Sequence, residues 1–279
     1  MSNPNMRIIV DPGTFDCLNM GDVAMLKVAV RRLGILLPSA AIGVLTSSPN
    51  RLLDHVETGL PVNHHGRLVW FSDSALTGGL KERIPGLLSG LLSEFNRSLR
   101  HHKPELLSAL LHWKSRIGGA DGRAAVSFLQ EMQKADLYVV SGAITLTDKS
   151  KGHGRMVLDS LEMAINRGIP AVMFSQGLGP LYDPNLIARA RAVLPRVDLI
   201  TVRERRNATR LLASLGVDPA RVLVTGDDAV ELAHEMRPLG RGQAIGVNLR
   251  VGPSSDVSAS VVETLRPVAC SEKKQARGE

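Results

Sequence analysis

Four short segments combine glycine or small polar residues with side chains that could bind an anion. They are Asn19-Met20-Gly21-Asp22, Ser141-Gly142-Ala143-Ile144-Thr145, Gln176-Gly177-Leu178-Gly179-Pro180 and Val202-Arg203-Glu204-Arg205-Arg206. Glycine lets a ligand approach the backbone closely, and the guanidinium group of arginine matches the geometry of carboxylate and phosphate groups. Together the segments indicate a site for a small anionic molecule.

Each segment also has a purely structural interpretation. Asn19 or Asp22 could simply cap a helix, since Asn and Asp are favoured caps. Segments 141–145 and 176–180 could be tight turns, and the arginines around Arg203 could be a solvent-exposed run of charge. Arginine in the first turn of a helix opposes the helix dipole, however, which favours a bound anion there.

Proton transfer has two candidates, Asp22 and His153. A carboxylate or an imidazole within reach of a reacting group can act as an acid or base, although a histidine near a helix start can also just face solvent. Asp227-Asp228 could hold a metal ion, but capping of the following helix is the simpler reading. The adjacent pairs His64-His65 and His101-His102 point apart, so we expect no metal site.

Apolar, β-rich runs alternate with helical patterns through most of the chain. The expected strands are residues 7–10, 41–46, 67–71, 136–140, 171–174, 198–202, 221–224 and 244–248. The expected helices include residues 21–36, 153–167, 184–194, 208–215 and 258–265. Strands separated by single helices predict an α/β fold, a Rossmann-like parallel sheet covered by helices on both faces. Ligands of such sheets bind at the carboxyl ends of the strands, where the four segments fall.

The chain divides unevenly in this interpretation. Residues 1–237 form a Rossmann-like domain that carries a Leu-rich helical insertion at about 76–134. After a linker at 238–242, residues 243–270 begin a second α/β unit that the chain does not complete. Residues 271–279 are charged and expected to be a disordered tail.

Composition excludes several classes of protein. The 279 residues carry a net charge of +7, which suits an anionic partner, but only 3% are aromatic, which argues against nucleic-acid binding by base stacking. No apolar run approaches a membrane span, the N-terminus lacks the features of a secretory signal, and the two cysteines suggest a reducing, cytoplasmic location.

Taken in order, these loops resemble the polysaccharide pyruvyl transferase family. The matching pieces are Asn19-Met20-Gly21-Asp22-Val23-Ala24, Val140-Ser141-Gly142, Ser175-Gln176-Gly177-Leu178-Gly179-Pro180, Thr201-Val202-Arg203-Glu204, Thr225-Gly226-Asp227-Asp228 and Gly246-Val247-Asn248-Leu249-Arg250. The resemblance implies two Rossmann-like halves facing a cleft, as in the GT-B glycosyltransferases, of which residues 1–237 would be the N-terminal half. It further implies phosphoenolpyruvate as donor, a saccharide acceptor that is often lipid-linked, and a cyclic pyruvate ketal as product in cell-surface or exopolysaccharide synthesis.

Within that resemblance, Arg203 matches a donor-binding arginine. The expected substrate-binding residues are Asn19, Gly21, Asp22, Ser141, Gly142, Gln176, Gly177, Gly179, Arg203 and Arg250. No cofactor is expected. A basic amphipathic segment at 76–113 fits peripheral contact with the inner face of a membrane, although packing of these helices on the protein is the simpler reading. A homo-oligomer is compatible with the sequence.

Two departures from the family pattern keep alternatives open. Ala143 and Ile144 interrupt a stretch that is usually Gly-rich, and no Arg-x-His motif follows Arg250. We therefore expect a shortened member, or one whose missing wall a partner supplies. The alternatives are a GT-B-like glycosyltransferase that uses a nucleotide sugar and a non-catalytic, degenerate family member.

Overall fold

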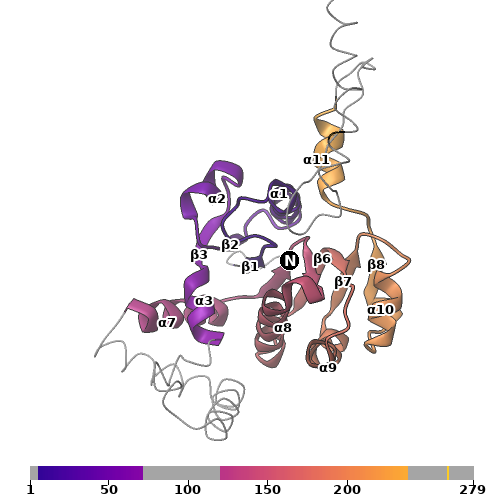
Figure 1. The fold of residues 1–279 in the computed structure, drawn as a ribbon. Coiled ribbons are helices and arrows are strands. Elements are labelled where there is room, and N and C mark those ends of the chain that lie inside the picture. Colours follow the sequence, from indigo (N-terminus) through magenta and orange to yellow (C-terminus); the bar gives the residue numbers. More distant parts are fainter. Residues whose placement is uncertain (1–5, 72–119, 238–262, 264–279) are drawn as a thin grey trace, which may run out of the picture. The chain divides into compact units, whose positions relative to one another are not determined.

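A computed structural model describes residues 6–71, 120–237 and 263 of the chain (Figure 1). The chain divides into two compact units, residues 1–236 and 237–279. Only Arg237 and Glu263 are described in the second unit, so the fold below is that of the first. Segment 76–113, the strand expected at 244–248, Arg250 and the tail at 271–279 lie outside the described residues.

A single parallel sheet organises the first unit. Its strands are β1 (Arg7–Asp11), β2 (Ala41–Thr46), β3 (Leu60–Asn63), β4 (Leu137–Val140), β5 (Ile144–Leu146), β6 (Ala171–Leu178), β7 (Leu199–Val202) and β8 (Val222–Val224). Their order is β3-β2-β1-β4-β6-β7-β8, and β5 pairs with the far end of β6. The predicted α/β fold with a Rossmann-like parallel sheet is confirmed.

Helices cover both faces of this sheet. They are α1 (Met20–Leu36), α2 (Pro49–His55), α3 (His64–Phe71), α7 (Ala120–Gln133), α8 (Lys151–Asn166), α9 (Pro184–Val193), α10 (Ala208–Ser214) and α11 (Ala229–Glu235), with short 3-10 turns at Asp148–Ser150, Leu194–Arg196 and Pro219–Arg221.

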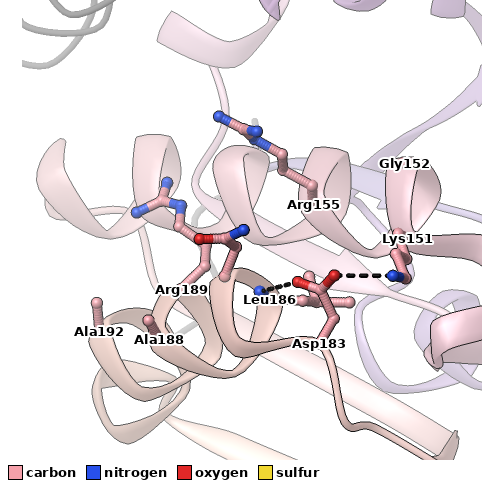
Figure 2. Close-up of a pocket in the computed structure, with 9 residues that line it drawn as sticks. Lys151, Gly152, Arg155, Asp183, Leu186, Ala188, Arg189 and Ala192 are labelled. Atoms are coloured by element: carbon pink, nitrogen blue, oxygen red, sulfur yellow. Dashed lines mark hydrogen bonds and ion pairs between the residues drawn. The ribbon is translucent and has the colours of Figure 1, made fainter.

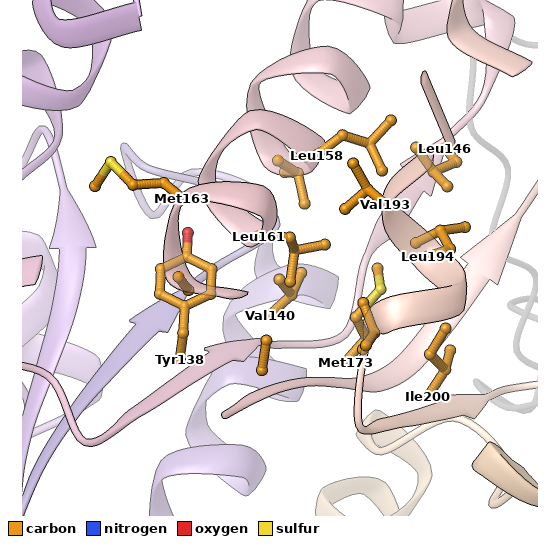
Figure 3. Close-up of a cluster of buried hydrophobic side chains, with 14 of the residues drawn as sticks. Tyr138, Val140, Leu146, Leu158, Leu161, Met163, Met173, Val193, Leu194 and Ile200 are labelled. Atoms are coloured by element: carbon orange, nitrogen blue, oxygen red, sulfur yellow. The ribbon is translucent and has the colours of Figure 1, made fainter. Parts of the chain in front are cut away.

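Alternation along the strands divides the core in two. Ile8 and Val10 pack on one face with α1 and α2, whereas Ile9 belongs to a larger cluster with α3, α7, α8 and α9. Figure 3 shows part of the larger cluster, where Tyr138 and Met173 of the sheet lie beneath Leu161 of α8. Burial on both faces explains why the strands are continuous apolar runs in the sequence.

The direction in which successive strands are added to the sheet reverses between β1 and β4. From β1 the chain moves outward through β2 to β3, and it returns to place β4 on the other side of β1. The carboxyl ends of β1 and β4 therefore open at a topological switch point, which is the usual ligand position in such sheets.

A buried ion pair lies at this switch point. Asp11, the last residue of β1, accepts a hydrogen bond from Arg67 of α3 at 2.7 Å and another from the hydroxyl group of Tyr138 in β4 at 2.8 Å. All three side chains are fully buried. The pair therefore fixes α3 against the end of the sheet.

Helix α11 is attached to α1 by charge. Arg31 pairs with Glu231 at 2.5 Å and with Glu235 at 2.8 Å, and Arg32 pairs with Asp228 at 2.8 Å and also with Glu231. No residue of α11 is buried. Its position depends mainly on these ion pairs.

The strand predicted at 67–71 is wrong, because these residues continue helix α3. His64, Arg67 and Trp70 recur every three residues and turn one buried face inward, while Gly66 lies so close to α7 that a Cβ atom there would be 2.0 Å from the carbonyl oxygen of Ala124. Tertiary packing overrides the β propensity of this apolar run. The glycine-rich sequence of residues 118–122 also predicts a loop, which is wrong from Ala120 onward, where α7 begins.

The buried ion pair gives a stability prediction. We expect Asp11→Asn to lower the free energy of unfolding by about 3–5 kcal/mol, because the charge of Arg67 stays buried without its partner. Urea unfolding of the native and variant proteins measures this.

Lys134→Ala is the matched control for removal of a charge. Its amine lies 3.6 Å from Glu131 and its side chain is 68% exposed, so we expect a loss below about 1 kcal/mol. Equal effects of the two substitutions would contradict a structural role for the buried pair.

Candidate functional site

The loop after β1 and the segment after β4 pack against each other at the switch point. A Cβ atom on Gly13 would lie 2.4 Å from the Cβ atom of Ala143, and one on Gly142 would lie 2.6 Å from the sulfur of Met25 in α1. Glycine is thus required at both positions by close packing. Gly142 has this structural task in addition to any role in binding.

Asn19 caps helix α1. Its Oδ1 accepts from the backbone N–H of Gly21 at 3.1 Å, and its Nδ2 donates to the carboxylate of Asp22 at 2.8 Å. This is the structural alternative raised by the sequence. Asn19 and Gly21 are exposed and Asp22 is half-buried, so all three lie at the surface of the carboxyl edge.

Gln176 and Ser141 lie inside the protein. The Gln176 amide nitrogen donates to the carbonyl oxygens of Ser141 at 2.9 Å and Phe174 at 2.8 Å, and its oxygen accepts from the hydroxyl group of Thr145. Both Gln176 and Ser141 are fully buried. The geometry favours a role for Gln176 in joining the ends of β4, β5 and β6 rather than direct contact with a ligand.

Arg203 lies at the carboxyl end of β7, over the backbone of β6. Its Nη1 donates to Asp227 Oδ2 at 2.8 Å, and a Cβ atom on Gly177 would lie 2.0 Å from its Nη2. The absence of a side chain at Gly177 therefore makes room for the guanidinium group, whose side chain is 21% exposed. Gly179, with φ of +83°, turns the chain immediately beyond.

Asp227 and Asp228 have separate partners. Asp227 Oδ1 accepts from the N–H of Ala229, the first residue of α11, at 3.0 Å, while Asp228 pairs with Arg32. In the part of the chain that is described, no three His, Cys, Asp or Glu side chains gather as metal ligands would.

A cavity of about 420 Å³ opens at the carboxyl ends of β1 and β2. Its wall includes Thr14, Phe15, Asp16, Ser47, His64 and His153. We call it the β1–β2 cavity. His153 was a candidate from the sequence. Phe15, Asp16 and His64 were not, although Phe15 and Asp16 directly follow a buried strand at the switch point, and that position could have identified them.

Aromatic contacts fix the rings of this cavity. The rings of Phe15 and His64 stack with centroids 3.6 Å apart, and the ring of His153 is tilted against Phe15 at 5.8 Å. The Cζ atom of Arg67 lies 5.3 Å from the Phe15 centroid.

The titratable groups of the cavity have shifted pKa values. Burial, and then the charge of Arg67, lowers the pKa of His64 from 6.5 to about 4. Burial likewise lowers the pKa of His153. Hydrogen bonds from the hydroxyl group of Thr14 and the N–H of Leu18 lower the pKa of Asp16. At neutral pH the cavity therefore presents two neutral imidazoles and one carboxylate.

A larger cavity of about 750 Å³ lies between α8 and α9 (Figure 2). Its charges are largely compensated, because Lys151 pairs with Asp183 at 2.8 Å and Arg189 pairs with Asp159 at 2.6 Å. Asp183 also caps α9 by accepting from the N–H of Leu186 at 2.9 Å. None of the expected site residues lines this cavity.

The structure brings the expected residues together in two groups. One lies around β1 and β4 and contains Asn19, Gly21, Asp22, Ser141 and Gly142; the other lies at the ends of β6 and β7 and contains Gln176, Gly177, Gly179 and Arg203. The N–H of Gly177 donates to the carbonyl oxygen of Ala143 at 2.8 Å, which joins the two groups along one edge.

The chain matches a known protein family. A family model described as polysaccharide pyruvyl transferase matches residues 19–259. No curated protein matches the chain significantly. The matched range contains both groups of expected residues, but it begins after Thr14, Phe15 and Asp16 of the β1–β2 cavity.

The low pKa of His64 predicts a pH dependence of stability. The folded protein takes up the His64 proton only near pH 4, whereas the unfolded chain takes it up near 6.5. The buried, neutral His64 therefore costs no stability above about pH 6.5. Below that pH the free energy of unfolding falls, by about 3 kcal/mol in all, as the pH drops to 4.

Urea unfolding between pH 7 and pH 4.5 measures this loss. We expect His64→Gln to show a shallower fall in stability than the native protein, while His65→Gln, next in sequence and exposed, keeps the native slope. A His64 ring that titrates near pH 6.5 by NMR would contradict the burial seen here.

Proposed function

The chain belongs to the polysaccharide pyruvyl transferase family, and on this premise we propose that it transfers pyruvate from phosphoenolpyruvate to a saccharide as a cyclic ketal. The family is one of transferases that act on polysaccharides. The observation that carries the donor assignment is Arg203, held over Gly177 at the carboxyl ends of β6 and β7.

Phosphoenolpyruvate carries a carboxylate and a phosphate, and Arg203 is suited to bind either. Its guanidinium group is partly exposed and oriented by Asp227, and the planar fork of an arginine matches both anionic groups. Such a fixed cation stabilises negative charge that develops on a departing phosphate without reorganising during the reaction. Arg203 would thus contribute to both binding and chemistry.

Ketal formation requires a balanced set of proton transfers. Two sugar hydroxyl oxygens bond to C2 of phosphoenolpyruvate, the bond from C2 to the phosphate oxygen breaks, and C3 gains a proton to become a methyl group. One of the two hydroxyl protons balances that gain, and the other leaves with phosphate. His153 is neutral at pH 7 because burial lowers its pKa, so it can accept a hydroxyl proton; Asp22 is the second candidate.

The acceptor is proposed to be a lipid-linked saccharide, reached at the inner face of a membrane. The net charge of +7 favours contact with an anionic surface. Within the described ranges, no helix is long and apolar enough to cross a bilayer.

Arg203→Ala tests the donor site. We expect it to weaken phosphoenolpyruvate binding about 10- to 100-fold, because a charge-assisted interaction of about 1.5–3 kcal/mol is lost. Titration calorimetry measures the affinity, and release of phosphate in the presence of saccharides measures turnover.

Arg206→Ala is the matched control, since Arg206 is exposed in the same run of charge. Its binding should equal that of the native protein. Unchanged binding in Arg203→Ala would remove this residue from the site, and binding of a nucleotide sugar instead of phosphoenolpyruvate would favour a glycosyltransferase.

Gly177→Ala tests the support beneath Arg203. The added methyl group would occupy the place of Nη2, so the guanidinium group must move. We expect about a 10-fold loss of phosphoenolpyruvate affinity, equivalent to about 1.4 kcal/mol, with little change in unfolding free energy.

Gly152→Ala provides the comparison, because a Cβ atom there meets nothing within 4 Å. We expect it to bind phosphoenolpyruvate as the native protein does. Native affinity in Gly177→Ala would show that the position of Arg203 over β6 is not needed for binding.

A further inference from the structure

The wall of the β1–β2 cavity is polar but carries little net charge. Thr14 and Ser47 contribute hydroxyl groups, His64 and His153 contribute imidazoles that are neutral at pH 7, and Asp16 contributes a carboxylate. Its volume of about 420 Å³ falls within the range usual for small-molecule sites. These groups can exchange hydrogen bonds with a ligand that is rich in hydroxyl groups.

His64 provides hydrogen-bonding capacity that the protein does not use. Its side chain is only 5% exposed, lines the cavity, and has a buried Nδ1 without a hydrogen-bond partner among the described residues. A buried polar atom that lacks a partner is costly, so its presence in the wall of this cavity calls for an explanation. The stack on Phe15 holds the ring in a fixed orientation.

Asp16 is similarly prepared to accept hydrogen bonds. Its Oδ1 already accepts from the hydroxyl group of Thr14 at 2.7 Å and the N–H of Leu18 at 3.0 Å, which orients the carboxylate. No described residue donates a hydrogen bond to its Oδ2. An oriented carboxylate binds two sugar hydroxyls well and repels an anion.

Arg67 does not turn the cavity into an anion site. It is fully buried, and its charge is paired with Asp11 at 2.7 Å. Its Cζ atom lies 5.3 Å from the ring of Phe15, which also contributes to the cavity wall. The cavity is thus distinct in its chemistry from the cationic position of Arg203 at the ends of β6 and β7.

We propose that the β1–β2 cavity binds one neutral pyranose unit of the acceptor, through hydrogen bonds to Asp16, His64 and His153 and apolar contact with Phe15. The acceptor role rests on the proposed function, whereas pyranose binding itself does not. Thr14, Phe15 and Asp16 precede the residues matched by the family model, so the family match does not assign this site.

Saturation-transfer NMR on the full chain tests this subsite. The probes are methyl β-D-glucopyranoside, methyl β-D-galactopyranoside and methyl α-D-mannopyranoside, titrated to about 50 mM because single sugars bind in the millimolar range. We expect at least one probe to bind, and Asp16→Asn and His153→Gln each to weaken it 10-fold or more. Thermal unfolding of each variant establishes that it is folded.

The matched controls separate this site from its surroundings. His65→Gln, adjacent to His64 but exposed, and Arg203→Ala should bind the pyranoside as the native protein does. Absence of binding for all three probes, native affinity in both cavity variants, or displacement of the pyranoside by phosphoenolpyruvate would each overturn the proposal. If the native protein binds a pyranoside but not phosphoenolpyruvate, the donor assignment is rejected and the pyranose site stands.

Discussion

The rest of this edge of the molecule depends on a charge buried at the end of β1. The buried Asp11 carboxyl group accepts hydrogen bonds from Arg67 and Tyr138, and those donors come from α3 and β4. The three elements are therefore held in one arrangement at the switch point. His64 begins the same helix as Arg67, so the orientation of α3 also sets the position of the His64 ring on Phe15.

The carboxyl edge separates two kinds of chemistry on one rigid sheet. At the ends of β6 and β7, a glycine and an aspartate orient a cation. At the ends of β1 and β2, polar groups surround a cavity whose wall contains no lysine or arginine among the residues that the structure describes. Strand β5 and the bond from Gly177 to Ala143 connect the two regions. Under the proposed function, an anionic donor must meet a neutral sugar hydroxyl group. Such a division serves that reaction, because the carboxylate of the cavity repels the donor and the cation does not attract the neutral acceptor.

Much of the fold could be predicted because burial on both faces leaves a strong signal in the sequence. Continuous apolar runs predicted six of the eight described strands, namely β1, β2, β4, β6, β7 and β8, whereas β3 and β5 were missed. The predicted helix at 184–194 matches α9, which begins at Pro184. The residues of α3 could not be assigned from local pattern, since Leu68-Val69-Trp70-Phe71 has strand-like composition and only contact with α7 selects a helix. Ligand contact by Gln176 stays a prediction, and its hydrogen bonds to Ser141 and Phe174 depend on how the sheet splits, which no local pattern records. The β1–β2 cavity combines residues from distant loops, so only the three-dimensional arrangement reveals it.

The attachment of α11 has a thermodynamic consequence. Because no residue of this helix is buried, its release from α1 would expose little apolar surface and so carry only a small change in heat capacity. Its binding energy comes instead from Arg31 and Arg32, whose side chains are 36% and 48% exposed and hence screened by dissolved ions. Undocking of this segment would therefore be almost silent in calorimetry yet responsive to ionic strength, unlike melting of the sheet beneath it.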